Sequence, residues 1–251
     1  MNYKNIAKIL NLDVEKDIES AKILNRLICD LNKKFAPGIL ENLIKNKVVI
    51  VFGAGPSLLK DIEKIKARGM HEKCTLIAAD GAVKALLEKN IIPGINVTDL
   101  DGDINAIIGA NNSGTVTLIH AHGDNILQLK KYVPEFRGVV FGTCQVSRKN
   151  LKNIYNFGGF TDGDRCVFLG RYFNAKMIAI AGMDFGKVIG RYSGCYDYNF
   201  KIKKMEIAKI LLEEIASGCR IFNLTVGGDN LKNIEKIEVG EFEKLVEELQ
   251  V

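Results

Sequence analysis

The stretch VVIVFGAGPSLLKDIEKIKARG, residues 48–69, decides the fold class. It begins with five consecutive apolar residues, which are typical of a parallel strand buried on both faces. The glycine-rich turn GAGPS (53–57) follows, and apolar residues then recur at helical spacing. A strand, a glycine-rich turn and a helix form an arrangement that binds phosphate groups. The alternative is a tight turn without a ligand, because this one matches neither GxGxxG nor a Walker A loop.

The same unit recurs along the chain. Further apolar runs of strand type begin near residues 75, 95, 115, 138, 177 and 219, and helical patterns lie between several of them. Strands that alternate with helices predict an α/β fold with a Rossmann-like, mainly parallel sheet and helices on both faces. We expect this single domain to span residues 46–251. Residues 1–45, with an amphipathic helix over 14–35, predict an N-terminal helical arm without a chemical motif, and residues 191–201 predict a loop.

Composition limits the functional classes. Of the 251 residues 47% are hydrophobic and 26% charged, as in ordinary globular proteins, and the net charge of +5 is mild. We therefore expect no nucleic-acid partner. No apolar run could span a bilayer and the first residues lack a secretory signal, which predicts a cytoplasmic protein without a membrane partner. The six cysteines form no CxxC pair and predict reduced thiols.

The run TDLDGD (98–103) follows a predicted strand and places Asp99, Asp101 and Asp103 at alternate positions. On an extended backbone alternate side chains point to one side. Carboxylates that close repel each other, and a hard cation such as Mg²⁺, which prefers oxygen ligands, would relieve this repulsion. The alternative is a solvated turn, since Asp and Gly are ordinary turn residues.

A second polar cluster, HAHGDN (120–125), follows another predicted strand. Its two histidines are two residues apart and should lie on one side of the chain. With Asp124 they could hold zinc or Fe(II), or they could clamp a substrate or exchange a proton near neutral pH. We favour contact with the substrate and its proton over a metal site for His120, His122 and Asp124. Asn125 would be a neighbouring substrate contact.

Six of the seven predicted strands end in Gly, Asp or His residues. The carboxyl ends of parallel strands share one edge of a sheet, and ligands bind at that edge. We therefore expect the residues at positions 53, 80, 99, 120, 162 and 184 to converge. Asp80 and Asp162 also suit helix N-caps, which is the alternative for each.

Several of these motifs resemble known families. Asp80-Gly81-Ala82, Pro93 and Asp99-Leu100-Asp101 resemble the signature of thiamin diphosphokinases, and Thr161-Asp162 resembles their later metal-binding Thr-Asp. The full series GAGPS, AADGA, TDLDGD, HAHGDN, GFTDGDR and GMDFG, over roughly residues 45–230, more closely resembles archaeal MptE-type 6-hydroxymethyl-7,8-dihydropterin diphosphokinases.

This resemblance implies transfer of diphosphate from ATP to a pterin alcohol, with Mg²⁺ as cofactor and AMP as product, in the biosynthesis of tetrahydromethanopterin or folate-type cofactors. A homodimer is a compatible assembly. The expected metal ligands are Asp99, Asp101, Asp103 and Asp162. The expected nucleotide contacts are Gly53, Gly55, Pro56, Ser57, Asp80 and Gly81. The expected catalytic residues are Asp101, His120, His122, Asp124 and Arg165. The expected pterin contacts are Asn125, Asp164, Asp184 and Phe185.

Two other functions are compatible with the same residues. Glycosyltransferase-like proteins share the GAGPSL start, so TDLDGD could be a DxD metal site for a nucleotide sugar. A nucleotide-binding module without catalysis is the third hypothesis. AMP release that depends on the pterin, hydrolysis of a nucleotide sugar, or tight nucleotide binding without turnover would distinguish the three.

Overall fold

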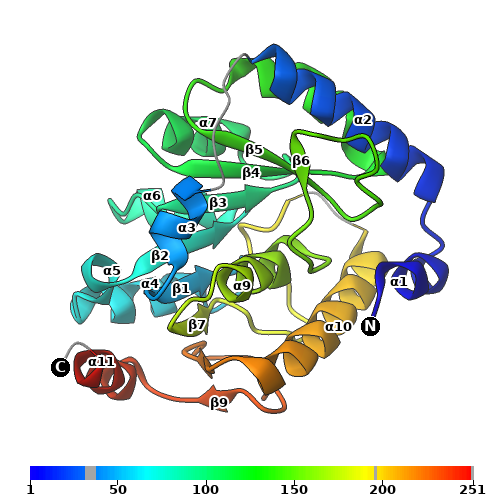
Figure 1. Cartoon of the computed structure of the whole chain (residues 1–251). Coiled ribbons are helices and arrows are strands. Elements are labelled where there is room, and N and C mark those ends of the chain that lie inside the picture. Colours follow the sequence, from blue (N-terminus) through cyan, green and yellow to red (C-terminus); the bar gives the residue numbers. More distant parts are fainter. Residues whose placement is uncertain (32–37, 195–196, 250–251) are drawn as a thin grey trace.

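The computed structural model describes residues 1–31, 38–194 and 197–249, and its centre is one nine-stranded sheet (Figure 1). All neighbouring strands pair in parallel. The strands are β1 (Val48–Phe52), β2 (Thr75–Ala79), β3 (Ile95–Thr98), β4 (Val116–Ala121), β5 (Val140–Cys144), β6 (Ile154–Tyr155), β7 (Met177–Ala181), β8 (Ile221–Asn223) and β9 (Glu235–Lys236). Their order is β6-β5-β4-β3-β2-β1-β7-β8-β9. The predicted α/β class is confirmed.

Helices cover both faces of this sheet (Figure 1). They are α1 (Tyr3–Leu10), α2 (Val14–Asp30), α3 (Gly38–Ile44), α4 (Leu58–Ala67), α5 (Met70–Lys73), α6 (Ala82–Glu88), α7 (Ile104–Asn112), α8 (Ile126–Tyr132), α9 (Asp162–Tyr172), α10 (Tyr198–Ile215) and α11 (Val239–Glu248). Alternate side chains of β1 enter different cores: Ile50 and Phe52 pack with α2, α4 and α6, whereas Val49 and Val51 pack with α3, α9 and α10. Burial on both faces explains the continuous apolar run.

The strand order reverses beside β1. The sheet grows from β1 through β2 to β6, and the chain then returns to place β7 on the other side of β1. Ligands bind in the crevice that such a reversal opens outside the carboxyl ends of the strands. Backbone hydrogen bonds join the loops after β1 and β7 there: Gly53 N donates to Ala181 O at 2.9 Å, and Gly55 N donates to Gly182 O at 2.8 Å.

The N-terminal arm packs against the rest of the molecule. Apolar side chains of α2, among them Leu24 and Ile28, belong to the same core cluster as the strands. The helix predicted over 14–35 ends at Asp30, and residues 32–35 lie outside the described part of the chain. Helix α1 contacts α10 through a small separate cluster, which includes Ile6, Leu10, Ile207 and Leu211. The arm therefore supports α10 from outside.

Two sequence-based boundaries differ from the structure. The edge strands β6 and β9 have two residues each, which is too short for a periodic pattern to reveal. The predicted loop 191–201 is too long, because α10 begins at Tyr198 after Asp197 caps it by accepting the Phe200 N–H at 2.8 Å. Among the described helices, none has both the length and the apolar character needed to cross a membrane.

Candidate active site

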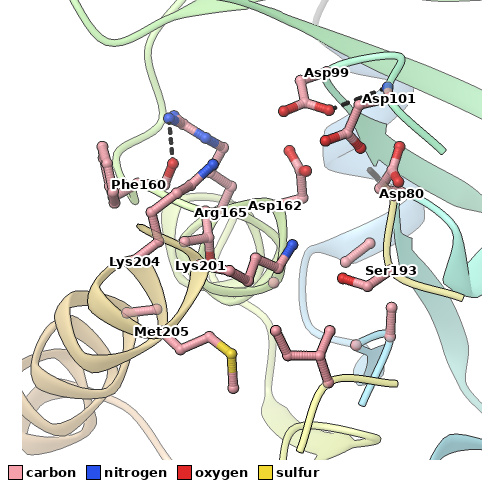
Figure 2. Close-up of a pocket in the computed structure, with 18 of the residues that line it drawn as sticks. Asp80, Asp99, Asp101, Phe160, Asp162, Arg165, Ser193, Lys201, Lys204 and Met205 are labelled. Atoms are coloured by element: carbon pink, nitrogen blue, oxygen red, sulfur yellow. Dashed lines mark hydrogen bonds between the residues drawn. The ribbon is translucent and has the colours of Figure 1, made fainter. Parts of the chain in front are cut away.

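A cavity of about 190 Å³ lies at the carboxyl ends of the strands. It is lined by the loops after β1, β2, β3, β4 and β7, by the start of α9 and by one side of α10 (Figure 2). The predicted convergence is confirmed, because the residues at all six positions line this cavity: Gly53, Asp80, Asp99, His120, Asp162 and Asp184.

Three carboxylates gather on one wall of the cavity. Oxygen atoms of Asp80, Asp99 and Asp162 lie within 4.8 Å of one another. Asp101 lies beside them, and its backbone N–H donates to Asp99 Oδ1 at 3.3 Å (Figure 2). The set therefore includes Asp80, which we had expected to contact the nucleotide, and it consists of hard oxygen donors that suit Mg²⁺.

The backbone is bent to bring these carboxylates together. Asp80 and Leu100 have φ angles of 41° and 68°, in the left-handed region that non-glycine residues rarely adopt. The Thr98 hydroxyl joins the two bends, since it donates to Asp80 Oδ1 at 2.6 Å and accepts the Leu100 N–H at 2.9 Å. Any side chain at Gly102 would collide with the Asp80 carboxylate. The strained turns are consistent with a functional site.

The charges of the cluster act on one another. Burial and the charge of Asp99 raise the pKa of Asp80 to about 7, and enclosure with Asp99 and Asp80 raises the pKa of Asp101 to about 8. Burial and the charges of Asp99 and Asp101 hold the pKa of Asp162 well above its usual range. Burial opposes ionisation of Asp99 too, but the hydrogen bond from His122 and the charge of Lys204 outweigh it and lower that pKa. The wall favours a bound cation.

His122 orients a member of this cluster. Its Nε2 lies 3.2 Å from Asp99 Oδ2, and its Nδ1 accepts the backbone N–H of Asp124 at 3.3 Å. An Nδ1 that accepts carries no proton, so Nε2 carries it and donates to Asp99. Both nitrogens of His122 therefore already have partners.

His120 has a different environment, although its ring stacks beside that of His122 with centroids 6.4 Å apart. Its Nδ1 lies 3.0 Å from Thr143 Oγ1, and that hydroxyl donates its proton to the carbonyl of Ile119 at 3.2 Å. Nδ1–H must then be the donor to Thr143, which leaves Nε2 as an acceptor. Nε2 is buried and has no hydrogen-bond partner within the described residues. Burial and the charge of Arg165 keep the pKa of His120 well below its usual value.

Arg165 lies opposite the carboxylates and is 7% exposed. Its Nη2 donates to Gln145 Oε1 and to the carbonyl of Phe160, both at 2.7 Å. Gln145 Nε2 in turn donates to Asp17 Oδ2 at 3.0 Å, and Asp17 Oδ1 accepts the Gly123 N–H at 2.6 Å. Asp17 and Gln145 were missed from the sequence, because one Asp on an amphipathic helix gives no local signal of such a role.

Comparison with known proteins gives the family. The family model described as MptE-like, 6-hydroxymethylpterin diphosphokinase, matches residues 19–190. This chain belongs to the MptE-like family. A protein named 6-hydroxymethyl-7,8-dihydropterin pyrophosphokinase from Methanocaldococcus jannaschii is 46% identical over 221 residues, or 84% of this chain and 91% of that one. Proteins with the same name from Methanothermobacter thermautotrophicus and Pyrococcus furiosus are 42% and 38% identical, covering 76% and 87% of this chain and 79% and 93% of theirs.

A solved structure shares the fold of this MptE-like chain. The MAf glycosyltransferase from Magnetospirillum magneticum AMB-1 aligns with 82% of the chain at a TM-score of 0.53 and 16% identity. The match takes in 37% of that longer protein. It shows a common α/β architecture, and the chemistry has to be argued from the site itself.

Several predicted site residues of this MptE-like chain have structural contacts instead of a place on the cavity wall. Asp103 caps α7 by accepting the Ala106 N–H and forms an ion pair with Lys84 at 2.7 Å. Fully buried Asp164 accepts the N–H groups of Phe160 and Thr161, each at 2.6 Å. These carboxylates are committed to helix starts, so their assignment as a metal ligand and a pterin contact is corrected.

Two more predicted contacts, Asn125 and Gly81, also lie outside the lining of the cavity. The Asn125 amide donates to the carbonyls of Asp99 and His120 at 2.8 and 2.7 Å. It thereby holds the loop after β3 and the end of β4 together. Gly81 is the residue before α6 and packs against the carbonyl of Tyr192, away from the main cavity. Asp124 does line the cavity, but its side chain is 83% exposed.

Most of the backbone N–H groups in the glycine-rich turn are bonded within the protein, so the structure gives little support to the phosphate cradle predicted there. Gly53 N and Gly55 N donate to the β7 loop, and Ser57 N donates to Asp184 Oδ2 at 3.2 Å. Pro56 has no N–H. The Ser57 hydroxyl also bonds to Asp184, so neither residue has its main polar group free for a nucleotide or pterin. Gly53, Gly55 and Pro56 line the cavity and contribute to its shape.

We expect Gly55→Ala to lower the free energy of unfolding by about 1–3 kcal/mol, as overpacking does in tight sites. The added Cβ would collide with the Asp184 carboxylate and lie 2.5 Å from the Gly182 carbonyl oxygen. Urea denaturation measures the loss. Gly109→Ala is the matched control, since nothing lies within 4 Å of a Cβ there. Unchanged stability with a raised Michaelis constant for ATP would return the turn to a phosphate-binding role.

Proposed function

We propose that this chain transfers the terminal diphosphate of ATP to the hydroxymethyl oxygen of 6-hydroxymethyl-7,8-dihydropterin and releases AMP, with Mg²⁺ as cofactor. The observation that carries the proposal is the meeting of three carboxylates and an unpartnered histidine nitrogen in one cavity. The names of the three archaeal relatives support the pterin as acceptor. The reaction would belong to cytoplasmic biosynthesis of tetrahydromethanopterin or folate-type cofactors.

The donor set fits the proposed metal. Asp80, Asp99 and Asp162 would hold Mg²⁺, which is bound by a few carboxylates together with substrate phosphates. A zinc site at His120, His122 and Asp124 fits less well, since His122 uses both ring nitrogens and these three residues form no such group in the described structure. Bound Mg²⁺ would neutralise charge that develops on the phosphates.

The protein side of the reaction is mainly positioning. The hydroxymethyl oxygen forms a bond to the β-phosphorus of ATP, the bond from that phosphorus to the α–β bridging oxygen breaks, and AMP leaves with the oxygen. The hydroxyl proton goes to His120 Nε2, the buried acceptor without a partner. His122 holds Asp99 in place. The pterin ring would lie on the apolar side of the cavity, which includes Met183, Phe185, Val188 and Met205.

The test is incubation of the purified protein with ATP, Mg²⁺ and the pterin alcohol, with AMP separated by chromatography and the diphosphate ester detected by ³¹P NMR. We expect equal amounts of AMP and ester, and no AMP when the pterin is omitted. ADP or phosphate in place of AMP would contradict diphosphate transfer. Turnover of a nucleotide sugar, or nucleotide binding without any product, would support the two rival functions.

Mg²⁺ binding should strengthen at least about 10-fold from pH 6.5 to 8.5, because ligands must lose protons to bind metal. The pKa values of about 7 and 8 for Asp80 and Asp101 mean that the metal-free cluster holds protons at pH 6.5. Since raised carboxyl pKa values favour the protonated folded state, the stability of the metal-free protein should fall as pH rises through 7 and 8. Calorimetry in two buffers counts the released protons. Binding that is independent of pH would contradict this.

A further inference from the structure

The triphosphate of ATP needs a binding surface that the glycine-rich turn does not provide. Its amides at Gly53, Gly55 and Ser57 are bonded within the protein. The carboxylate wall cannot hold phosphate oxygens by itself, because both are negative. Cationic side chains that line the same cavity are therefore the place to look.

Helix α10 carries two such side chains. Lys201 and Lys204 are three residues apart, so they lie on one face of the helix. Both line the cavity and are half-buried. Figure 2 shows them extending from α10 into the space between Arg165 and the aspartates. Lys203 lies between them in sequence but is exposed and outside the cavity lining.

Arg165 is the strongest sign of an anionic ligand. Its guanidinium is buried, its two hydrogen bonds go to neutral oxygens, and no carboxylate lies within 4.0 Å of it in the described part of the chain. The charges of Asp164, Asp162 and Asp99 act on it only from beyond contact distance. A buried charge without a counter-ion in contact is costly, and an anionic ligand would supply one. The Gln145–Asp17 contacts fix the group in place, as a preformed binding site requires.

Lys204 completes the pattern. Its ammonium lies 5.9 Å from the centre of the Phe200 ring, and across residues 1–31, 38–194 and 197–249 no carboxylate comes within 4.0 Å of it. Its charge nevertheless reaches Asp99 and Asp162. Arg165 and Lys204 thus face the carboxylate wall without an ion pair to it among the described residues, which leaves room for a metal-bound anion between them.

We propose that Arg165, Lys201 and Lys204 form a clamp for a linear polyphosphate, the triphosphate tail of a nucleotide, which lies between the clamp and the carboxylate wall. Arg165 binds phosphate oxygens in a fixed, fork-like geometry, and the two lysines add mobile point charges. The packing of α1 against α10 through Ile6 and Leu10 holds the lysines at the cavity. The assignment to ATP rests on the proposed function, but the clamp chemistry requires only a polyphosphate.

The experiment is calorimetric binding of inorganic tripolyphosphate, with and without Mg²⁺, to the full chain and to Lys201→Gln, Lys204→Gln and Lys203→Gln. Each variant removes one positive charge from the same helix. We expect the first two to weaken binding at least about 10-fold, in line with a charged hydrogen bond, and Lys203→Gln less than about twofold. Lys204→Arg should restore most of the affinity. Circular dichroism checks the fold of each variant.

Equal weakening by Lys203→Gln and Lys204→Gln, or binding unchanged in all variants, would overturn the clamp. So would absence of tripolyphosphate binding by the wild-type protein. The outcome is separable from that of the proposed reaction. Lysine-dependent binding without formation of AMP would leave the clamp and refute the diphosphokinase, whereas AMP formation with an unchanged Michaelis constant for ATP in Lys201→Gln and Lys204→Gln would do the reverse.

Discussion

Replacing Asp162 with asparagine should lower turnover by at least about 100-fold, the usual effect of removing a key electrostatic group from an active site. Asp162 is one of the three converging carboxylates, and it is the first residue of α9. No hydrogen bond reaches its carboxylate in the described structure. Burial and the neighbouring aspartates oppose its charge more than Arg165 and Lys204 stabilise it in the metal-free protein. The melting temperature without metal should therefore stay the same or rise.

This combination of lost activity and retained stability identifies a metal ligand. In the wild-type protein added Mg²⁺ should raise the melting temperature by mass action, and this rise should be absent in Asp162→Asn. Differential scanning fluorimetry with and without Mg²⁺ measures it. Near-normal turnover, or an unchanged response to Mg²⁺, would show that Asp162 does not hold the metal.

Asp164→Asn is the matched control, two residues along the same helix. Asp164 is fully buried and accepts the N–H groups of Phe160 and Thr161. An asparagine amide would face one of these donors with its own N–H, at a cost of about 2–3 kcal/mol in the free energy of unfolding. We expect this variant to lose stability while the folded fraction keeps its response to Mg²⁺, the opposite of Asp162→Asn.

The pair shows what the sequence could predict and what it could not. In TDGD both aspartates stand at the start of a helix, and the sequence correctly placed this start at the edge of a parallel sheet. Which aspartate caps the helix and which enters the cavity depends on backbone angles that composition and spacing do not specify. The same ambiguity explains why Asp80 was assigned to the nucleotide and Asp103 to the metal.

Residues that reach the site from helices were beyond the sequence patterns. Strand ends converge by the rule of parallel topology, so Asp99 and His120 could be found. Asp17 on α2 and Lys204 on α10 lie at the cavity because of how these whole helices pack. From the sequence alone, a lysine or aspartate on an amphipathic helix is assigned to its solvated face. The GAGPS turn shows the opposite case, in which a sequence motif suggested a ligand contact. Its glycines serve close packing against Gly182 and Asp184.

His120→Asn should reduce turnover by about 100-fold, the lower end of what a positioned proton acceptor contributes. Asparagine can still donate to Thr143 Oγ1 in place of Nδ1–H, but it is too short to offer an acceptor at the position of Nε2. The fold should tolerate the change. The Michaelis constant for ATP should stay within a few-fold, since the proposed polyphosphate contacts are Arg165, Lys201 and Lys204 and do not include His120.

The pH dependence separates the two histidines. Burial keeps the pKa of His120 well below its usual value of about 6.5, so this residue does not change its protonation state near that pH. The wild-type rate should therefore show no acid limb near 6.5 that disappears in His120→Asn. His122→Asn removes the donor to Asp99 and should instead weaken Mg²⁺ binding, as loss of a group that orients a ligand does. Rates between pH 5.5 and 9, measured at saturating and limiting Mg²⁺, test both effects. If excess Mg²⁺ rescues His120→Asn and not His122→Asn, the roles assigned to the two rings are reversed, because only a defect in metal binding can be overcome by more metal.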